Sequence, residues 1–338
     1  MTFRVRPAHA GDFAAIYEMA KLTGGGFTNL PPDRATLVQK LARSEDSFKR
    51  TDDVQADDLY MFVLEDPEAG IIRGTCQVFG QVGVRQPFYS YHISTLTQSS
   101  PELGKTFRNQ MLSLTTDLEG SSEVGGLFLH PNARAGGWGS LLARSRYLFI
   151  MMHRARFGQR VLAELRGVMD EAGNAPFWDG LAGRFFDMTF PEADEFNAVH
   201  GTQFIADLMP KTPIYVALLN DSARAVMGLP HPTGRAALRM LEEEGFTFDR
   251  YIDIFDGGPT VTAPTDQIRT VRESDYETIA EIGGGGKTKA LVAHGSLLDF
   301  RSCCASVKRV SRKSICIDPE AAELLGVKEG DEVLVVRR

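Results

Sequence analysis

The sequence predicts a mixed α/β fold, in which a largely antiparallel sheet is flanked by helices and followed by a small β-rich, barrel-like extension. Three observations support this fold class. Segments with the periodicity of strands and helices alternate through roughly the first 255 residues. Two early strands, Leu59 to Leu64 and Ile71 to Phe79, flank the turn residues Pro67 and Gly70, which predicts an antiparallel hairpin. Beyond about residue 265, short β-rich runs alternate with glycine turns.

The N-terminal segment has the order strand, helix, helix, hairpin. Phe3 to Arg6 alternates between apolar and polar side chains, as a short strand does. Asp12 and Asp33 can each cap the start of a helix, because a carboxylate accepts hydrogen bonds from free backbone N–H groups. The predicted strand Phe88 to Leu96 continues the antiparallel meander after the hairpin.

The middle of the chain contains one long apolar helix and then a region of short helices. We expect a strand from Glu123 to Leu129, a glycine-rich turn, and a helix from about Trp138 to Phe157. Val161 to Leu165 and Tyr251 to Phe255 are further predicted strands. Between these two strands, prolines divide a helical insertion around residues 175–245 into short pieces.

The C-terminal segment is predicted to form a separate β-rich domain. Its strand-like runs are divided by the glycines 283–286 and by a turn at Gly330. The stretch Pro319 to Val336 resembles the final helix, turn and strand of small double-psi-type barrels. We therefore expect two domains, residues 1–264 and residues 265–338.

Composition and charge argue against several classes of protein. The 37 Lys and Arg residues and 44 Asp and Glu residues give a net charge of −7, which disfavours nucleic-acid binding because phosphates require basic surface. The longest apolar run, Tyr147 to Met152, is far shorter than the ~18 residues of a membrane span. The opening Met1 to Pro7 lacks the apolar stretch of a secretory signal, so we expect a cytoplasmic location. The spacings of cysteine and histidine predict free thiols and no metal site.

The most informative stretch runs from Leu127 to Leu142, LFLHPNARAGGWGSLL in one-letter code. It places Arg134, Gly137 and Gly139 in the pattern R-x-x-G-x-G between a strand and a helix. The N-terminus of a helix presents free N–H groups and the positive end of the helix dipole, which suit a diphosphate. Glycines let the backbone approach such a ligand closely. A glycine-rich turn with a purely structural role is the alternative interpretation.

This stretch and its setting resemble the acyl-CoA site of the GNAT superfamily. The resemblance implies that the diphosphate of the acyl-CoA binds at the start of the helix, and that the backbone of the preceding strand pairs with the pantetheine arm. The residues implied in binding succinyl-CoA are Leu127, Leu129, Arg134, Gly137 and Gly139. Ala135 stands where the superfamily often has glycine, which puts the shape of this loop in doubt.

A narrower resemblance, to the arginine N-succinyltransferases, covers nearly the whole chain. Its blocks are TGGGFTNLP at 23–31, GSSE at 120–123, AELRGVMDE at 163–171, PFWD at 176–179, FIADLMPK at 204–211 and YIDIFDGGPT at 251–260. The resemblance implies transfer of succinyl from succinyl-CoA to the α-amino group of L-arginine, a step of arginine catabolism, by direct attack. It also implies a homo-oligomer or a pair with a homologous subunit, and no cofactor besides the co-substrate succinyl-CoA.

His231 is the candidate catalytic residue. It stands in the block GLPHPTGR, whose histidine is the proton donor in this family, and the resemblance implies the same role here. The flanking prolines restrict the backbone, and Thr233 can cap the following helix. An unperturbed imidazole titrates near ~6.5, close to working pH. A loop histidine without a role is the alternative.

The reaction needs further charged groups. Glu123 could take a proton from the substrate ammonium, directly or through water, as acids on this strand do in some relatives, or it could be a solvated edge residue. The candidates for binding the substrate guanidinium are Asp170, Glu171 and Asp179. The candidate cations for the succinyl carboxylate are Arg166, Arg184 and Lys211. Each of these six could equally be an ordinary surface ion.

Three alternative functions stay open. A sister subunit type that also accepts ornithine would share the same motifs. Another CoA-dependent acyltransferase, for example one that uses acetyl-CoA, would share the acyl-CoA turn. A non-catalytic CoA-binding or assembly subunit belongs to a different class, and the presence of both His231 and the R-x-x-G-x-G pattern argues against it.

Overall fold

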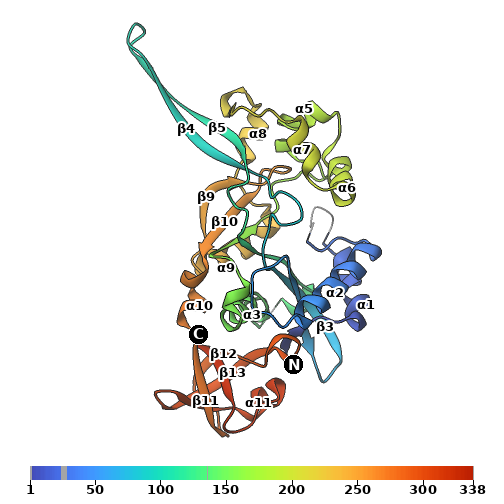
Figure 1. Ribbon diagram of the computed structural model, residues 1–338, viewed down its shortest axis with the longest axis vertical. Helices are drawn as coiled ribbons and strands as arrows, with labels where there is room; N and C mark the ends of the chain where they lie inside the picture. Colours follow the sequence, from blue (N-terminus) through green and yellow to red (C-terminus); the bar gives the residue numbers. More distant parts are fainter. Residues whose placement is uncertain (1, 24–28, 135, 338) are drawn as a thin grey trace. The chain divides into compact units, whose positions relative to one another are not determined.

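The structure is a computed structural model that describes residues 2–23, 29–134 and 136–337 (Figure 1). Its residues fall into two compact units, which we describe separately. The first unit contains Met1–Gly80, Ser122–Gln159 and Pro264–Arg338, and the second contains Gln81–Ser121 and Arg160–Ala263. In the described ranges, no helix is both long enough and apolar enough to cross a membrane.

The first unit contains an antiparallel sheet with helices packed on it. Its strands follow the order β1 (Arg4–Pro7), β2 (Leu59–Asp66), β3 (Ile71–Phe79) and β6 (Ser122–Leu129). Its helices are α1 (Phe13–Lys21), α2 (Arg34–Lys49), α3 (Trp138–Met152) and α10 (Arg269–Glu273). The predicted hairpin is confirmed, because β2 pairs with β3 from Leu59 opposite Phe79 to Asp66 opposite Ile71.

The two predicted helix caps have different outcomes. Asp33 caps α2, and its carboxylate accepts a hydrogen bond from the Thr36 N–H at 2.7 Å. The expectation for Asp12 is wrong, because its carboxylate makes no side-chain cap for α1. The Asp12 oxygens instead accept from the Arg6 guanidinium at 2.8 and 2.9 Å, and Oδ2 also accepts from the His9 N–H at 3.0 Å.

An aromatic cluster forms the centre of the first unit. The ring of Phe149, on α3, has centroid distances between 4.9 and 6.0 Å to five other rings. These rings belong to Phe48, Tyr60, Phe62, Phe157 and Phe300. The body of α3 is therefore fixed by burial of large apolar side chains.

In the described part of the chain, five C-terminal strands of the first unit close into a small barrel (orange to red in Figure 1). Their order is β12 (Thr288–His294), β15 (Glu332–Arg337), β11 (Asp275–Ile282), β14 (Ser314–Ile317) and β13 (Arg301–Ser311), with β13 pairing back to β12. Helix α11 (Pro319–Leu325) precedes β15, and β13 also pairs with β1. The barrel-like extension is thus confirmed, whereas the predicted domain boundary after residue 264 stays a prediction.

The second unit is built on a sheet with the strand order β7, β10, β9, β4, β5, β8. These strands are β4 (Ser90–Ser100), β5 (Lys105–Thr115), β7 (Arg160–Glu164), β8 (Ile214–Tyr215), β9 (Thr247–Ile252) and β10 (Pro259–Pro264). Its helices are α4 (Pro176–Gly180), α5 (Gly183–Phe186), α6 (Phe190–His200), α7 (Gln203–Leu208), α8 (Asp221–Val226) and α9 (Arg235–Glu243). Strands β4 and β5 form a long two-stranded arm, teal in Figure 1.

The strand predicted from Tyr251 to Phe255 is misplaced. Strand β9 runs from Thr247 to Ile252, because the chain turns at Asp253. The Asp253 carboxylate accepts hydrogen bonds from the N–H groups of Phe255 and Asp256, at 2.7 and 2.9 Å, which closes a turn instead of extending the strand.

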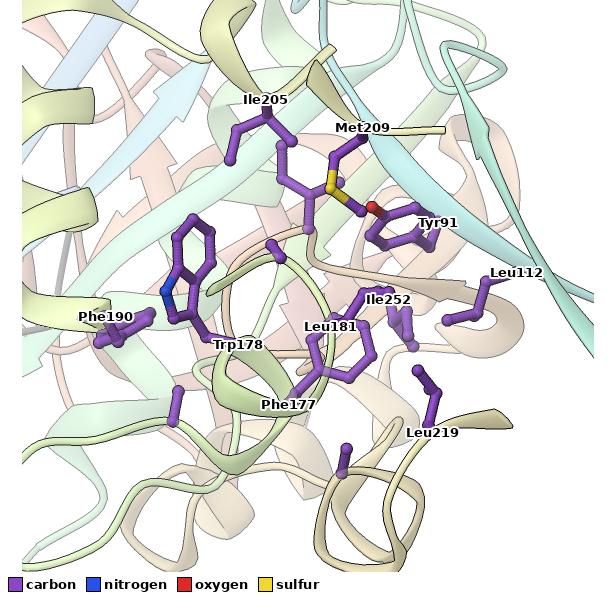
Figure 2. Packing of buried hydrophobic residues seen from close by; sticks show 14 of the residues in the cluster. Tyr91, Leu112, Phe177, Trp178, Leu181, Phe190, Ile205, Met209, Leu219 and Ile252 are labelled. Atoms are coloured by element: carbon purple, nitrogen blue, oxygen red, sulfur yellow. The ribbon is translucent and has the colours of Figure 1, made fainter. Parts of the chain in front are cut away.

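The short helices of the second unit bury their apolar side chains in one cluster. Figure 2 shows Phe177, Trp178 and Leu181 in this cluster with Tyr91 and Ile252 of the sheet. The Trp178 ring stacks on those of Phe186 and Phe255, with centroid distances of 5.8 and 5.7 Å. Short helices have little stability of their own, so this shared core fixes them on the sheet.

A core substitution tests how much the packing of the C-terminal segment against the rest of the first unit contributes to stability. Phe300→Ala should lower the free energy of unfolding by about 3–5 kcal/mol, because its fully buried ring contacts Phe62 and Phe149. Leu298→Ala is the control, since its side chain is 49% exposed and its loss should cost less than about 0.5 kcal/mol. Urea titration followed by circular dichroism measures both values, and equal values would contradict the packing.

Candidate active site

The turn between β6 and α3 contains the R-x-x-G-x-G pattern in the first unit. Gly136 and Gly137 have φ angles of 88° and 79°, in the left-handed region that residues with a side chain rarely adopt. Helix α3 begins at Trp138 with Gly137 as its N-cap, and no side chain caps it. Its first intrahelical bond runs from the Ser140 N–H to the Gly137 carbonyl at 3.1 Å. The N–H groups of Trp138 and Gly139, in the first turn, have no acceptor within the helix.

The five predicted CoA-binding residues lie together around this turn. Arg134 is exposed, and its Nε–H donates to the carbonyl of Leu129, at the end of β6, at 3.4 Å. Leu127 is half-buried in β6, next to Gly126, where a bulge shifts the pairing with β3. A Cβ added to Gly139 would meet only the Leu129 side chain, at 3.7 Å. Ala135 lies outside the described residues.

Glu123 lies at the start of β6 in a buried polar network. Its Oε1 accepts a hydrogen bond from Asn29 Nδ2 at 2.8 Å. The Asn29 carbonyl in turn accepts from Lys40 Nζ at 2.7 Å and from Gln77 Nε2 at 2.8 Å. Burial raises the pKa of Glu123 and lowers the pKa of Lys40 to about 8. Glu123 is therefore not a solvated edge residue, and it can carry a proton closer to neutral pH than an exposed carboxylate.

Backbone contacts between three segments hold His231 in the second unit. The His231 N–H donates to the Arg166 carbonyl at 2.7 Å, next to an antiparallel bridge between Gly167 and Pro230. On the other side of this ribbon, the Leu165 N–H donates to the Pro259 carbonyl at 3.1 Å. These bonds join the segments around Arg166, His231 and Pro259, which are far apart in the sequence.

Thr233 orients the imidazole of His231. The His231 Nδ1 lies 2.7 Å from the Thr233 Oγ1, and the Thr233 N–H donates to the same nitrogen at 3.3 Å. This pairing leaves the proton of a neutral ring on Nε2. The expectation that Thr233 caps the next helix is wrong, because α9 begins after Gly234 and the Thr233 hydroxyl contacts the imidazole instead. Burial and the Arg166 guanidinium lower the pKa of His231.

Asp253 and Asp256 form a pair of buried carboxyls, and Asp256 lies close to Arg166. The sequence patterns do not predict this pair. The Asp256 oxygens accept hydrogen bonds from the N–H groups of Gly167 and Gly258, at 2.7 and 2.8 Å. Burial raises the pKa of Asp253 and of Asp256, and the charge of Asp253 raises that of Asp256 further. The signal in the sequence is the presence of two aspartates in the apolar block YIDIFDGGP.

The other charged candidates are more exposed. The Asp170 carboxylate accepts hydrogen bonds from the N–H groups of Ala172 and Asn174, so it closes a local turn. Three further candidates are exposed on the second unit: Glu171, Asp179 and Arg184. Lys211 is also exposed, and its Nζ donates to the Ala206 carbonyl. Among the three predicted cations, Arg166 is the one with a described contact to His231.

The structure groups the predicted residues into two sets. The acyl-CoA turn and Glu123 belong to the first unit, whereas His231 and Arg166 belong to the second. Across the described ranges, no cluster of three or more His, Cys, Asp or Glu side chains could hold a metal ion. The arrangement offers an uncapped helix N-terminus in the first unit and two titratable side chains with shifted pKa values, Glu123 in the first unit and His231 in the second.

Gly139 gives a clean test of the acyl-CoA turn, because its φ angle is not in the left-handed region and an added Cβ has space. If the diphosphate binds at the start of α3 as predicted, Gly139→Ala should weaken succinyl-CoA binding by about 1–3 kcal/mol, or roughly 5- to 150-fold in Kd, since the added methyl group would hinder close approach to the backbone. Its melting temperature should stay equal or rise, because alanine favours the helix.

Isothermal titration calorimetry and thermal melts measure these two effects. Gly284→Ala is the matched control, because a Cβ at Gly284 would also meet open space but lies in the barrel. Wild-type affinity in Gly139→Ala would contradict the assignment of the turn.

Comparisons with known proteins place almost the whole chain in one family. The family model described as arginine N-succinyltransferase beta subunit matches residues 3–270, and the model of its C-terminal domain matches residues 267–337. The arginine N-succinyltransferase subunit beta of Pseudomonas aeruginosa is 39% identical over 332 residues, covering 98% of this chain and 97% of that protein. The arginine N-succinyltransferase of Salmonella arizonae is 40% identical over 338 residues, with the same coverage.

A solved structure supports the same assignment. Arginine/ornithine succinyltransferase subunit AI from Pseudomonas aeruginosa aligns with a TM-score of 0.90 and 34% sequence identity, covering 99% of this chain and 98% of that one. The likeness therefore extends over the α/β units and the barrel together. The chain belongs to the arginine N-succinyltransferase beta subunit family.

Proposed function

We propose that this chain is an acyltransferase that transfers succinyl from succinyl-CoA to the α-amino group of L-arginine. The observation that carries this proposal is the likeness to arginine N-succinyltransferases, at about 40% identity over nearly the whole chain. The uncapped N-terminus of α3 supports it, because that turn offers backbone N–H groups and a positive dipole end to the diphosphate of an acyl-CoA.

The proposed reaction is a direct attack of the neutral α-amine on the thioester carbon. The substrate ammonium first loses one proton to give the neutral amine. The new C–N bond then forms as the C–S bond breaks, the nitrogen loses a second proton, and the departing thiolate gains one. Glu123 is the proposed proton acceptor, since its buried carboxyl has a raised pKa. His231 is the proposed proton donor, through Nε2, while the Thr233 hydroxyl accepts from Nδ1 in the charged ring.

Ornithine is a second candidate acceptor. The aligned structure from Pseudomonas aeruginosa is named for both arginine and ornithine, which favours this second activity. Ornithine carries an α-amino group like arginine, so the same attack geometry serves both substrates. The two activities differ only in the group that the enzyme recognises at the far end of the side chain.

We further propose that the chain works in an oligomer, as a homo-oligomer or with a homologous subunit. Two of the relatives are named as subunits. The arm of β4 and β5 is consistent with this, because its outer half is exposed and carries exposed Leu96, Leu103 and Phe107. Long uncovered hairpins with free edges are unusual in proteins that stay monomeric.

The proposed activity predicts that the purified chain releases CoA thiol from succinyl-CoA when L-arginine is added. A thiol reagent follows the reaction, and mass spectrometry identifies the product as succinylated on the α-amine. Ornithine and acetyl-CoA serve as alternative substrates in matched assays. Absence of thiol release with succinyl-CoA and arginine would contradict the proposal, and faster turnover with ornithine would favour the second candidate.

His231→Ala should lower kcat by about 10²-fold, at the low end of general acid catalysis, because a thiolate is already a fair leaving group. The KM values should change little, since the proton is needed only in the transition state. His294→Ala is the control, because that half-buried histidine also bonds a nearby group through Nδ1 but lies in the barrel. A wild-type kcat in His231→Ala would remove this histidine from the mechanism.

A further inference from the structure

Arg166 and His231 are cross-strand neighbours in the second unit. The antiparallel bridge pairs Gly167 with Pro230, so the next pair along the ribbon is Arg166 opposite His231, joined by the 2.7 Å backbone hydrogen bond. Directly opposite residues of an antiparallel pair project their side chains to the same face. The guanidinium therefore lies near the imidazole, in agreement with its effect on the pKa of His231.

The Arg166 guanidinium is poorly satisfied. In the described part of the chain, its one side-chain hydrogen bond is from Nε to the Sδ of Met169, at 2.9 Å. Sulfur is a weak acceptor. Among the described residues, the carboxylates that act on this guanidinium, Asp256 and Asp194, do so through their charge and make no hydrogen bond to it. The two terminal nitrogens thus keep their fork of N–H donors, the geometry that binds a carboxylate in two parallel hydrogen bonds.

The nearby acidic residues do not replace such a ligand. Asp256 uses its oxygens to accept the Gly167 and Gly258 N–H groups. Burial raises the pKa of Asp256, Asp253 and Asp194, which favours the neutral form of each carboxyl. The half-buried Arg166 therefore carries a positive charge that this neighbourhood does not fully balance, and an incoming anion would balance it.

We propose that Arg166 binds a carboxylate of a substrate beside His231, and so determines which substrates the enzyme accepts. The inference rests on the proposed function, in which both substrates carry a carboxylate: the distal group of the succinyl chain and the α-carboxylate of arginine. The other two cations predicted from the sequence are less suitable. Arg184 is exposed, and Lys211 Nζ is engaged by the Ala206 carbonyl.

Carboxylate binding at Arg166 would also act on the proton donor. In the free protein, burial and the guanidinium both lower the pKa of His231. A bound carboxylate offsets the guanidinium charge, so the imidazole gains proton affinity as the substrate arrives.

The test compares Arg166→Met with the wild-type chain on two pairs of substrates. Succinyl-CoA is compared with butyryl-CoA, which has the same chain length without the carboxylate. L-arginine is compared with agmatine, which lacks the α-carboxylate. Both kcat/KM and calorimetric binding affinity are measured, so that the proposal is tested even without turnover. Arg166→Lys is the conservative variant and Arg184→Met the matched control, and thermal melts check that all variants fold.

In Arg166→Met we expect the preference for one carboxylate substrate over its uncharged analogue to fall by roughly 10²- to 10³-fold, as for loss of a paired charge. Loss of the succinyl over butyryl preference assigns the carboxylate to the acyl chain, and loss of the arginine over agmatine preference assigns it to the acceptor. Arg166→Lys should keep part of the preference, and Arg184→Met all of it.

The proposal is overturned if Arg166→Met folds and keeps both wild-type preferences, or if Arg184→Met loses them equally. Failure of the proposed function would give a different result. In that case the wild-type chain would show no thiol release from succinyl-CoA and arginine, while the binding preferences would still report on Arg166.

Discussion

The proposed acyl-CoA site of the first unit depends on one feature, a helix that begins without a side-chain cap. A side chain at the N-cap of α3 would add stability, but it would also occupy the N–H groups that a diphosphate needs. Gly137 occupies that position and no side chain caps the helix. The stability that the cap does not supply must come from elsewhere in the helix.

The body of α3 supplies it through contacts on several sides. Phe149 packs in the aromatic cluster, and the Ser145 hydroxyl bonds the Ser302 hydroxyl of β13 at 2.6 Å. Arg144, also buried, donates from Nε to the Thr270 hydroxyl at 2.8 Å. The last two contacts reach residues of the C-terminal segment, so that segment helps to hold the acyl-CoA turn in place, although it contributes none of the predicted CoA-binding residues.

How far the sequence predicts this molecule depends on the range of the interaction. The β2–β3 hairpin, the turn after β6, the start of α3 and helix α11 of the barrel follow from local spacing, and the structure confirms them. The predicted Asp12 cap is wrong, because the Asp12 carboxylate binds the Arg6 guanidinium. The predicted strand from Tyr251 to Phe255 is wrong, because the Asp253 carboxylate accepts the Phe255 N–H and closes a turn. The helix or strand propensity of a segment does not show which of two possible partners a polar side chain will bind.

The candidate site shows the same limit more strongly. The R-x-x-G-x-G turn is contiguous in the sequence, so its spacing predicts it. The resemblance of one block to the family implies the role of His231. The network of Glu123 with Asn29, Lys40 and Gln77 was not found, because its members come from α2, β3, β6 and the loop before α2. The pairing of Arg166 with His231 depends on a single bridge between distant segments, and no periodicity encodes it.

The buried carboxyls of the second unit have a consistent explanation in this arrangement. An ionised Asp256 would place a negative charge near Arg166 and offset part of the guanidinium charge. Burial and the neighbouring Asp253 instead favour the neutral form, so Asp256 can hold the ribbon through the Gly167 and Gly258 N–H groups while Arg166 keeps its charge. The same ribbon sets Arg166 opposite His231, so recognition of a carboxylate and delivery of a proton are coupled through the field of one guanidinium. Replacing that arginine would then change both the substrate preference and the proton affinity of the histidine, whereas replacing the histidine would leave the preference intact.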